Sequence, residues 1–262
     1  MAAQYRLDGY RTMTPSESTS AASARTRQTA PANRGPLYAV LIGAAWVASH
    51  IYAVFFHQIG DPLWATFAII AVQLWLYTGL FIVAHDTMHG SLAPNRPAVN
   101  KWVGRVILFW YAGFNWDSMR TAHHQHHATP GTADDPDFNA DNPRDFWPWY
   151  WRFFVQYFSW RQLVVLVAIG AVYMLLGASY PNLLVMWAVP AILSSVQLFY
   201  FGTFLTHRHG DPFADEHLSR SNNYPKWLSL LTCFHFGYHH EHHLYPHEPW
   251  WRLPARKRKP VA

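Results

Sequence analysis

Residues 63–90 read LWATFAIIAVQLWLYTGLFIVAHDTMHG, an apolar run that ends on two histidines four positions apart. A helix needs about 20 apolar residues to cross the hydrocarbon core of a bilayer, and the part before His85 meets that length. An i, i+4 spacing places His85 and His89 on the same helix face. The stretch therefore predicts a transmembrane helix that presents a pair of histidines where it leaves the bilayer.

Further apolar runs extend this pattern along the chain. They lie at residues 37–56, 163–178 and 183–205. Short turns at residues 58–62 and 179–182 join the four runs in pairs, and the shorter run at 103–114 favours a re-entrant or interfacial helix. The predicted fold class is all-α integral membrane, with four transmembrane helices in two hairpins and a cytoplasmic helical cap. A soluble helical bundle is the alternative.

The positive charges are segregated along the sequence. All 20 Lys and Arg lie before Leu37, between Arg96 and Arg161, or after Thr206, and neither short turn contains any. The positive-inside rule then places both turns outside and both termini in the cytoplasm; the bacterial inner membrane that we expect for the chain is implied only by the resemblance described below. The basic residues form no nucleic-acid-binding motif, so we expect no nucleic acid partner.

The length of 262 residues predicts one folded domain. Residues 1–34 are rich in Ser, Thr, Ala and Arg and predict a flexible cytoplasmic tail without the apolar core of a signal peptide. Residues 35–255 form the predicted domain, and residues 256–262 form a basic cytoplasmic tail suited to anionic headgroups. The single cysteine, Cys233, excludes intrachain disulfides and metal sites built from several cysteines.

Histidine is the unusual feature of the composition, with 17 in the chain. Two copies of His-x-x-His-His, at residues 123–127 and 239–243, place histidines on one helix face at i, i+3 and i+4. Neutral imidazole binds iron, zinc and copper, and the spacing alone does not choose among them. The candidate ligands, enough for two metals, are His85, His89, His123, His126, His127, His207, His239, His242 and His243.

Other residues near these motifs are candidates for supporting roles. His124 and His240 point about 100° away from their neighbours on a helix, and His235 lies one turn before His239. Ligand imidazoles need acceptors for their outer nitrogens. The acidic residues close enough in sequence are Asp86, Asp117, Asp134, Asp135, Asp137, Asp211 and Glu241.

The sequence around the histidines resembles that of one protein family. The stretches that carry the resemblance are HHQHHATPGT at 123–132, DPDF at 135–138, FGTFLTH at 201–207, HHEHHLYP at 239–246 and PWWRLP at 249–254. They are similar to the carotenoid ketolases of the bacterial beta-carotene 4-ketolase type, within the membrane fatty-acid desaturase/hydroxylase superfamily. The resemblance covers roughly residues 35–255.

The resemblance implies an activity and a cofactor. It implies two non-haem iron ions held by the nine histidines, with O2 as co-substrate and a carotenoid in the bilayer as substrate. Beta-carotene would give echinenone and canthaxanthin, and zeaxanthin would give astaxanthin. On this interpretation Asp86 and Asp117 are candidates for tuning the metals or positioning the ring.

The reductant must come from another protein. The chain has no glycine fingerprint for a dinucleotide and no Cys cluster, so a ferredoxin-type donor is the simplest inference. A carotenoid ring hydroxylase and a lipid desaturase of the same superfamily remain alternatives. From a different class, a membrane electron carrier that binds haem or metal, or a metal transporter, is a further alternative.

Overall fold

The computed structural model describes residues 34–257 of the chain. Every regular element in that range is a helix, as the apolar periodicity predicts. The predicted tails, residues 1–34 and 256–262, fall almost wholly outside the described residues. The all-helical part of the predicted fold class is therefore confirmed for residues 34–257.

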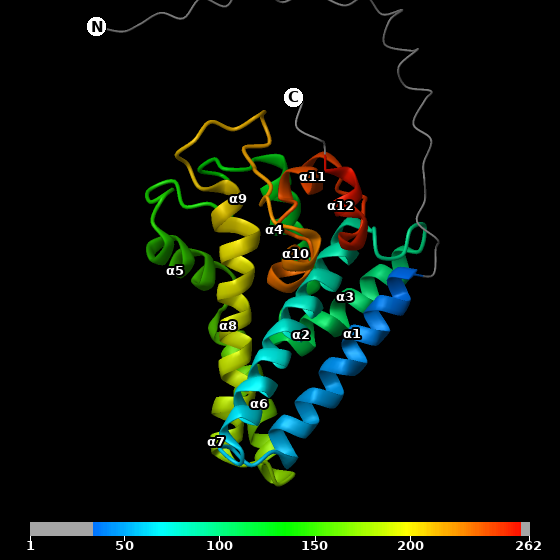
Figure 1. The fold of residues 1–262 in the computed structure, drawn as a ribbon, viewed down its shortest axis with the longest axis vertical. Coiled ribbons are helices and arrows are strands. Elements are labelled where there is room, and N and C mark those ends of the chain that lie inside the picture. Colours follow the sequence, from blue (N-terminus) through cyan, green and yellow to red (C-terminus); the bar gives the residue numbers. More distant parts are fainter. Residues whose placement is uncertain (1–33, 258–262) are drawn as a thin grey trace, which may run out of the picture. The chain divides into compact units, whose positions relative to one another are not determined.

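Within residues 34–257, three helices are long and apolar enough to cross a membrane: Arg34–Phe56, Leu63–His89 and Tyr180–His207. The first joins α1 (Arg34–Ile51) to a π-helical turn, η1 (Tyr52–Phe56), and the second is α2. The third is a continuous series of α7 (Tyr180–Asn182), η2 (Leu183–Ala188), α8 (Val189–Leu198), η3 (Phe199–Phe204) and α9 (Leu205–His207). Figure 1 shows the third series rising to the same end as α2.

The fourth predicted span, at residues 163–178, does not form a single straight helix across the membrane. Its residues form α6 (Trp160–Leu175), which follows α5 (Phe146–Tyr157) at a bend of 74°. Ser159 causes the break because it caps α6: its hydroxyl accepts from the Arg161 amide at 3.3 Å, and its own amide donates to Gln162 at 3.0 Å. With 16 residues, α6 extends about 24 Å and falls short of a hydrocarbon core of about 30 Å.

The shorter apolar run becomes α3 (Pro97–Ala112), which packs against α2. Gly104 permits this close approach, because a Cβ there would lie 2.1 Å from Trp116 Nε1 and 2.4 Å from Thr87 Oγ1. Trp116 begins α4 (Trp116–Ala128) and donates its indole N–H to Thr87 at 2.9 Å. This contact fixes the start of α4, which carries one His-x-x-His-His motif, against the last turns of α2.

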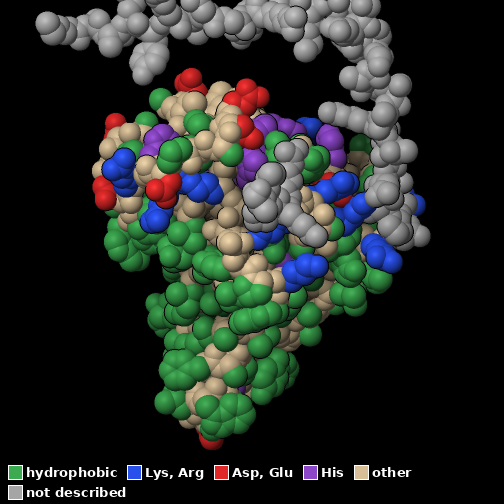
Figure 2. Space-filling view, turned by 45° about the horizontal axis from the view of Figure 1, so that its top comes forward, with side chains coloured by type: hydrophobic (Ala, Val, Ile, Leu, Met, Phe, Trp, Pro, Cys, Tyr) green, Lys and Arg blue, Asp and Glu red, His purple; other side chains and the backbone are tan. Residues whose placement is uncertain are grey.

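The remaining helices cover the end where α2 and α9 finish. They are α10 (Lys226–Cys233), α11 (His239–Leu244), the 3-10 turn η4 (Trp250–Arg252) and α12 (Leu253–Arg256). Figure 1 shows α4, α9 and α11 together at this end, and Figure 2 shows the charged and histidine side chains gathered there.

The long helices carry apolar side chains on the faces that point away from the protein interior. Trp64 on α2 is 72% exposed, and Val167 and Leu175 on α6 are 63% and 87% exposed. Large apolar side chains exposed over so wide a surface identify contact with lipid rather than water. The described residues therefore form a membrane protein with its polar, histidine-rich part at one end.

Candidate metal centre

The final turns of α2 carry the first histidine pair. Gly90 ends the helix in the left-handed conformation, at φ 71°, directly after His89. Glycine adopts that conformation without steric cost and is the usual terminator of a helix. The apolar run thus continues as helix through His85 and His89, which face the cap instead of lipid.

One group of five imidazoles brings together α2, α4 and α11. Its members are His85, His89, His123, His127 and His242, whose potential ligand atoms all lie within 4.8 Å of one another. The Nε2 atom of His242 lies 3.1 Å from that of His85 and 2.9 Å from that of His127. The Nε2 atoms of His89 and His123 are 2.6 Å apart. Nitrogen lone pairs from three helices therefore converge on one point.

A second group contains the other four predicted ligands. His126, His207, His239 and His243 are all buried, and their potential ligand atoms again lie within 4.8 Å of one another. The Nε2 atoms of His239 and His243 are 3.1 Å apart. Ring contacts join the two groups, because the rings of His127 and His243 stack at 4.3 Å between centroids. The structure thus brings together all nine histidines in two adjacent sets.

The two sets fit metal ions. A metal–nitrogen bond of about 2.1 Å places neighbouring ligand nitrogens around one ion about 3 Å apart, which is close to the distances between the Nε2 atoms given above. Burial, reinforced by neighbouring imidazoles, holds the pKa of His123, His239 and His242 well below the ordinary value. Neutral imidazole is the form that ligates metals, so the environment favours binding over protonation.

Two contacts fix the ring orientation in the second group. Buried Asp135 lies 2.9 and 3.0 Å from His126 Nδ1, which leaves Nε2 as the free lone pair. His207 Nδ1 donates to the Leu218 carbonyl at 2.8 Å, while its buried Nε2 has no hydrogen-bond partner. A carboxylate or carbonyl behind the ring is the usual support of a metal-bound histidine.

Asp135 is held in place by the loop that follows α4. The backbone amides of Gly131 and Asp137 each donate to its carboxylate at 2.8 Å. Burial acts to raise the pKa of Asp135, but the hydrogen bonds from His126 and these amides outweigh it and lower the pKa. For neighbouring Asp137, burial prevails and raises the pKa to about 6. Asp135 is therefore the charged partner of His126.

The two aspartates singled out from the sequence have different positions. Asp86 is buried, lies 3.5 Å from His85 Nδ1 and accepts from the Trp250 amide at 3.1 Å, which ties the C-terminal segment to α2. Asp117 does not reach the histidines. Its side chain is 53% exposed and pairs with Arg105 at 2.7 Å. Asp117 lies in the first turn of α4, where a negative charge stabilises the helix.

The other histidines of the motifs face away from both groups. His124 contacts the Met88 carbonyl at 3.2 Å, and His240 pairs with Asp215 at 2.8 Å. His235 lies outside the groups at a positive φ of 63°, with its ring stacked 6.1 Å from that of Trp250. Among the supporting groups, the Leu218 carbonyl was not foreseen, because a backbone acceptor has no sequence signal.

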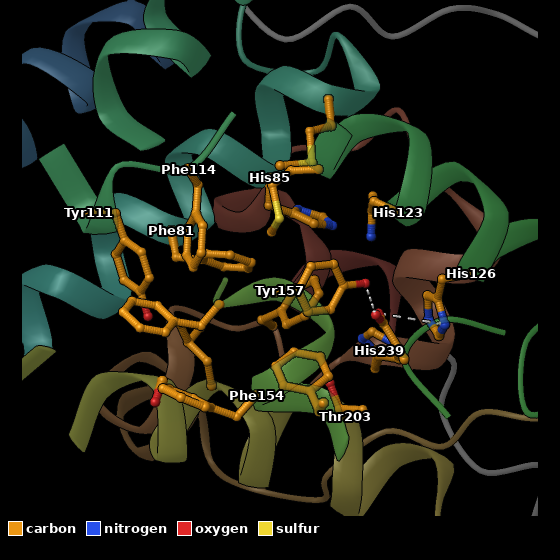
Figure 3. Close-up of a pocket in the computed structure, with 18 residues that line it drawn as sticks. Phe81, His85, Tyr111, Phe114, His123, His126, Phe154, Tyr157, Thr203 and His239 are labelled. Carbon is orange, nitrogen blue, oxygen red and sulfur yellow. Dashed lines mark hydrogen bonds and ion pairs between the residues drawn. The ribbon is translucent and has the colours of Figure 1, made fainter. Parts of the chain in front are cut away.

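An aromatic pocket opens beside the histidines, as Figure 3 shows. His85 and His123 from the first group and His126 and His239 from the second line one end of it. The rest of the lining is Phe81, Met88, Tyr111, Phe114, Met119, Asp137, Phe153, Phe154, Tyr157, Phe158, Ser195, Leu198, Thr203 and Phe236. Of these residues, sequence reasoning singled out Asp137 alone. It missed the aromatic ones because an aromatic residue on an apolar helix has the same pattern in a core, in lipid contact or in a pocket.

Comparisons with known proteins agree with this architecture. The family model described as "Fatty acid desaturase" matches residues 62–162 and 155–261. A beta-carotene ketolase of Paracoccus sp. (strain N81106 / MBIC 01143) is 48% identical over 219 residues, covering 82% of this chain and 89% of that protein.

Two further relatives extend the comparison. A beta-carotene ketolase of Paracoccus sp. (strain PC1) is 45% identical over 229 residues, covering 86% of this chain and 92% of that protein. A zeaxanthin 4-ketolase of Chlamydomonas reinhardtii is 34% identical over 233 residues, covering 84% of this chain and 52% of that protein. The chain therefore belongs to the beta-carotene ketolases of the fatty acid desaturase family.

Proposed function

We propose that this protein is a beta-carotene ketolase of carotenoid biosynthesis, which introduces keto groups at C4 and C4′ of the beta-ionone rings. The observation that carries the proposal is the pair of imidazole sets opening onto one aromatic pocket. Relatives named for the same activity at 45–48% identity support the same substrate. Oxidation of one ring gives echinenone, and oxidation of both gives canthaxanthin.

We assign one iron ion to each histidine set. His85, His89, His123, His127 and His242 would hold one ion, and His126, His207, His239 and His243 the other. Bound iron would supply the activation of O2, which no amino-acid side chain provides. The chain itself holds the imidazoles neutral and orients them, with Asp135 and the Leu218 carbonyl behind His126 and His207.

The target carbon explains why a metal is needed. C4 lies next to the ring double bond, and its C–H bonds are weakened but not acidic, so a general base has no proton to remove. Each hydroxylation uses one O2, two electrons and two protons and releases one water. Two hydroxylations at C4 give a geminal diol, which loses water to form the ketone.

The pocket positions the substrate. Its wall is largely aromatic, which suits a ring and conjugated polyene, and the histidines occupy one end. A ring that enters from the bilayer would place its C4 edge toward these histidines while the polyene stays between apolar side chains. Burial of His126, His239 and His242 keeps bulk water from the reacting carbon.

We propose a cytoplasmic position for this end of the protein, in a bacterial inner membrane. The turns at residues 58–62 and 179–182 carry no Lys or Arg, while Figure 2 shows Lys and Arg around the end that carries the histidines. The positive-inside rule favours the cytoplasm for such an end. With α5 and α6 together as one broken span, the chain crosses the membrane an even number of times. Both termini then lie on that same side.

We propose a ferredoxin-type protein as electron donor. Exposed basic residues around the histidine end, among them Lys101, Arg120, Arg208 and Lys226, favour an acidic partner. In isolated membranes, we expect ketone formation to require reduced ferredoxin and to slow as salt rises from about 0.05 to 0.3 M, because salt screens exposed charges. A rate that does not change with salt would contradict the electrostatic part of this proposal.

Expression in bacteria that accumulate beta-carotene tests the function. We expect echinenone and canthaxanthin in the pigment extract, together with about two iron atoms per purified chain and no haem absorption. Zeaxanthin alone would identify a ring hydroxylase instead. Unchanged pigment with altered membrane acyl chains would identify a lipid desaturase, and a haem spectrum would identify an electron carrier.

A further inference from the structure

Two polar side chains meet inside the aromatic pocket, next to the second histidine group. Tyr157, the last residue of α5, donates its hydroxyl to the carboxylate of Asp137, which lies in the loop after α4 (Figure 3). The other carboxylate oxygen of Asp137 lies 3.8 Å from His126 Nδ1. Both residues line the pocket, so this pair lies where the pocket meets the metal centre.

The pair differs from the hydroxyls of Tyr111 and Ser195, which also line the pocket. Tyr111 lines the same pocket, but its hydroxyl contacts Ser194 at 3.4 Å. Ser195 is engaged by Tyr150 at 2.7 Å and donates to the Ile192 carbonyl at 2.7 Å. A carboxylate has room for about four hydrogen bonds, so the bond from Tyr157 leaves acceptor positions on Asp137.

Asp137 is also fixed from behind. Its backbone amide donates to Asp135 at 2.8 Å, and Arg152 on α5 donates to the backbone carbonyls of Pro136 and Phe138 on either side. The carboxylate is therefore held at the pocket wall by the loop and by α5. A fixed acceptor in an apolar pocket favours a ligand that carries a hydroxyl there over one that does not.

We propose that Asp137, positioned by Tyr157, accepts a hydrogen bond from a hydroxyl on the ring at or beside the reacting carbon. This inference rests on the proposed function and extends it to a hydroxyl-binding subsite. The hydroxyl has two possible sources with the same chemistry. The first oxidation installs one at C4, and a hydroxylated substrate such as zeaxanthin already carries one at the neighbouring carbon C3.

The subsite has a clear consequence for a reaction in two rounds. A ring hydroxyl buried among aromatic side chains without a partner is unfavourable, so the half-oxidised ring would leave before its second oxidation. A hydrogen bond to Asp137 retains it and keeps the remaining C4–H bond near the histidines. The same bond favours a ring that arrives with a hydroxyl at C3.

Tyr157→Phe tests the subsite by removing one hydroxyl. Membranes with each protein receive beta-carotene or zeaxanthin separately, and the products are quantified. From beta-carotene we expect the ratio of 4-hydroxy to 4-keto products to rise about tenfold, because Asp137 loses the bond that positions it and the hydrogen bond from the ring hydroxyl to its carboxylate is lost as a result. From zeaxanthin we expect conversion relative to beta-carotene to fall about tenfold. If only the ratio of 4-hydroxy to 4-keto products changes, the subsite binds the hydroxyl that the first oxidation places at C4. If only the conversion of zeaxanthin relative to beta-carotene changes, the subsite binds the hydroxyl that the substrate already carries at C3.

Tyr150→Phe is the matched control, because it removes another tyrosine hydroxyl from α5, at a residue that does not line the pocket and whose hydroxyl contacts Ser195 at 2.7 Å. It should leave both ratios at the wild-type values. At position 137, Asn keeps an accepting oxygen and Ala does not, so Asp137→Asn should change the ratios less than Asp137→Ala. Compared at the same low conversion of substrate, these ratios do not depend on how much protein reaches the membrane, which separates positioning from simple loss of folded enzyme.

Two failures can be told apart. If Tyr157→Phe turns over beta-carotene with unchanged ratios, or if Tyr150→Phe changes them equally, the hydroxyl subsite is wrong while the ketolase function stands. If the wild-type protein forms no oxygenated carotenoid from either substrate, the proposed function fails and the subsite fails with it.

Discussion

We expect His242→Ala to abolish ketone formation, because His242 is central to the first histidine group. Its Nε2 atom lies within 3.1 Å of two other ligand nitrogens, on α2 and α4. Loss of a direct ligand should exceed the 10- to 100-fold effect that typically follows loss of a residue supporting a ligand. We expect no detectable ketone, and about one iron atom per chain in place of two, with normal insertion into the membrane.

His240→Ala provides the matched control within the same motif. The His240 ring turns away from the histidine groups, and its side chain is 22% exposed and paired with Asp215 at 2.8 Å. Removing a single, partly exposed pair of this kind has little effect on folding. Iron content and ketone yield should stay near the wild-type values. Full activity in His242→Ala, or equal losses in both variants, would refute the assignment of the first group as a metal site.

The second large effect concerns Asp135, which contacts His126 but is not itself among the proposed ligands. Its carboxylate accepts from His126 and from the amides of Gly131 and Asp137. In Asp135→Asn, an NH2 group replaces one accepting oxygen and faces a donor, so a buried hydrogen bond is lost. We expect a 10- to 100-fold loss of metal affinity, measured as the chelator concentration that removes half of the iron.

Asp134→Asn separates this effect from the loss of a negative charge near the site. Asp134 is the exposed neighbour of Asp135, and its backbone carbonyl accepts from Gln125 at 2.7 Å. Its substitution should leave the chelator midpoint unchanged. If Asp135→Asn also leaves that midpoint unchanged, His126 does not depend on the carboxylate and the proposed support of the second group is wrong.

Much of the fold was predictable because its signals are local. The runs at residues 37–56, 63–84 and 183–205 lie within helices long enough to cross a membrane. The run at residues 163–178 is helical as far as Leu175, but its connection to α5 was not foreseen. A serine cap at Ser159 ends one helix and starts another at an angle of 74°, and the apolar composition on both sides conceals that break.

The aspartates show where sequence proximity fails. Asp117 and Asp135 both lie within ten residues of a histidine in the same motif, and both were candidates for supporting a ligand. Asp117 projects from the exposed side of α4 and pairs with Arg105, while the loop after α4 returns Asp135 to the buried His126. The direction of that loop depends on its backbone bonds and its packing, which spacing along the chain does not encode.

From the sequence we could predict a set of nine histidines at one end of the helices, eight from their helical spacing and His207 from its place after the last apolar run, because these are properties of short segments. How the nine divide into two groups depends on tertiary packing. In α4, His123 and His127 join the first group and His126 the second, whereas in α11, His239 and His243 join the second and His242 the first. On a helix the i+3 residue lies about 60° to one side of residue i, and the i+4 residue about 40° to the other. That separation lets α4 and α11, packed together, each contribute to both groups, and only their packing sets which residue faces which group.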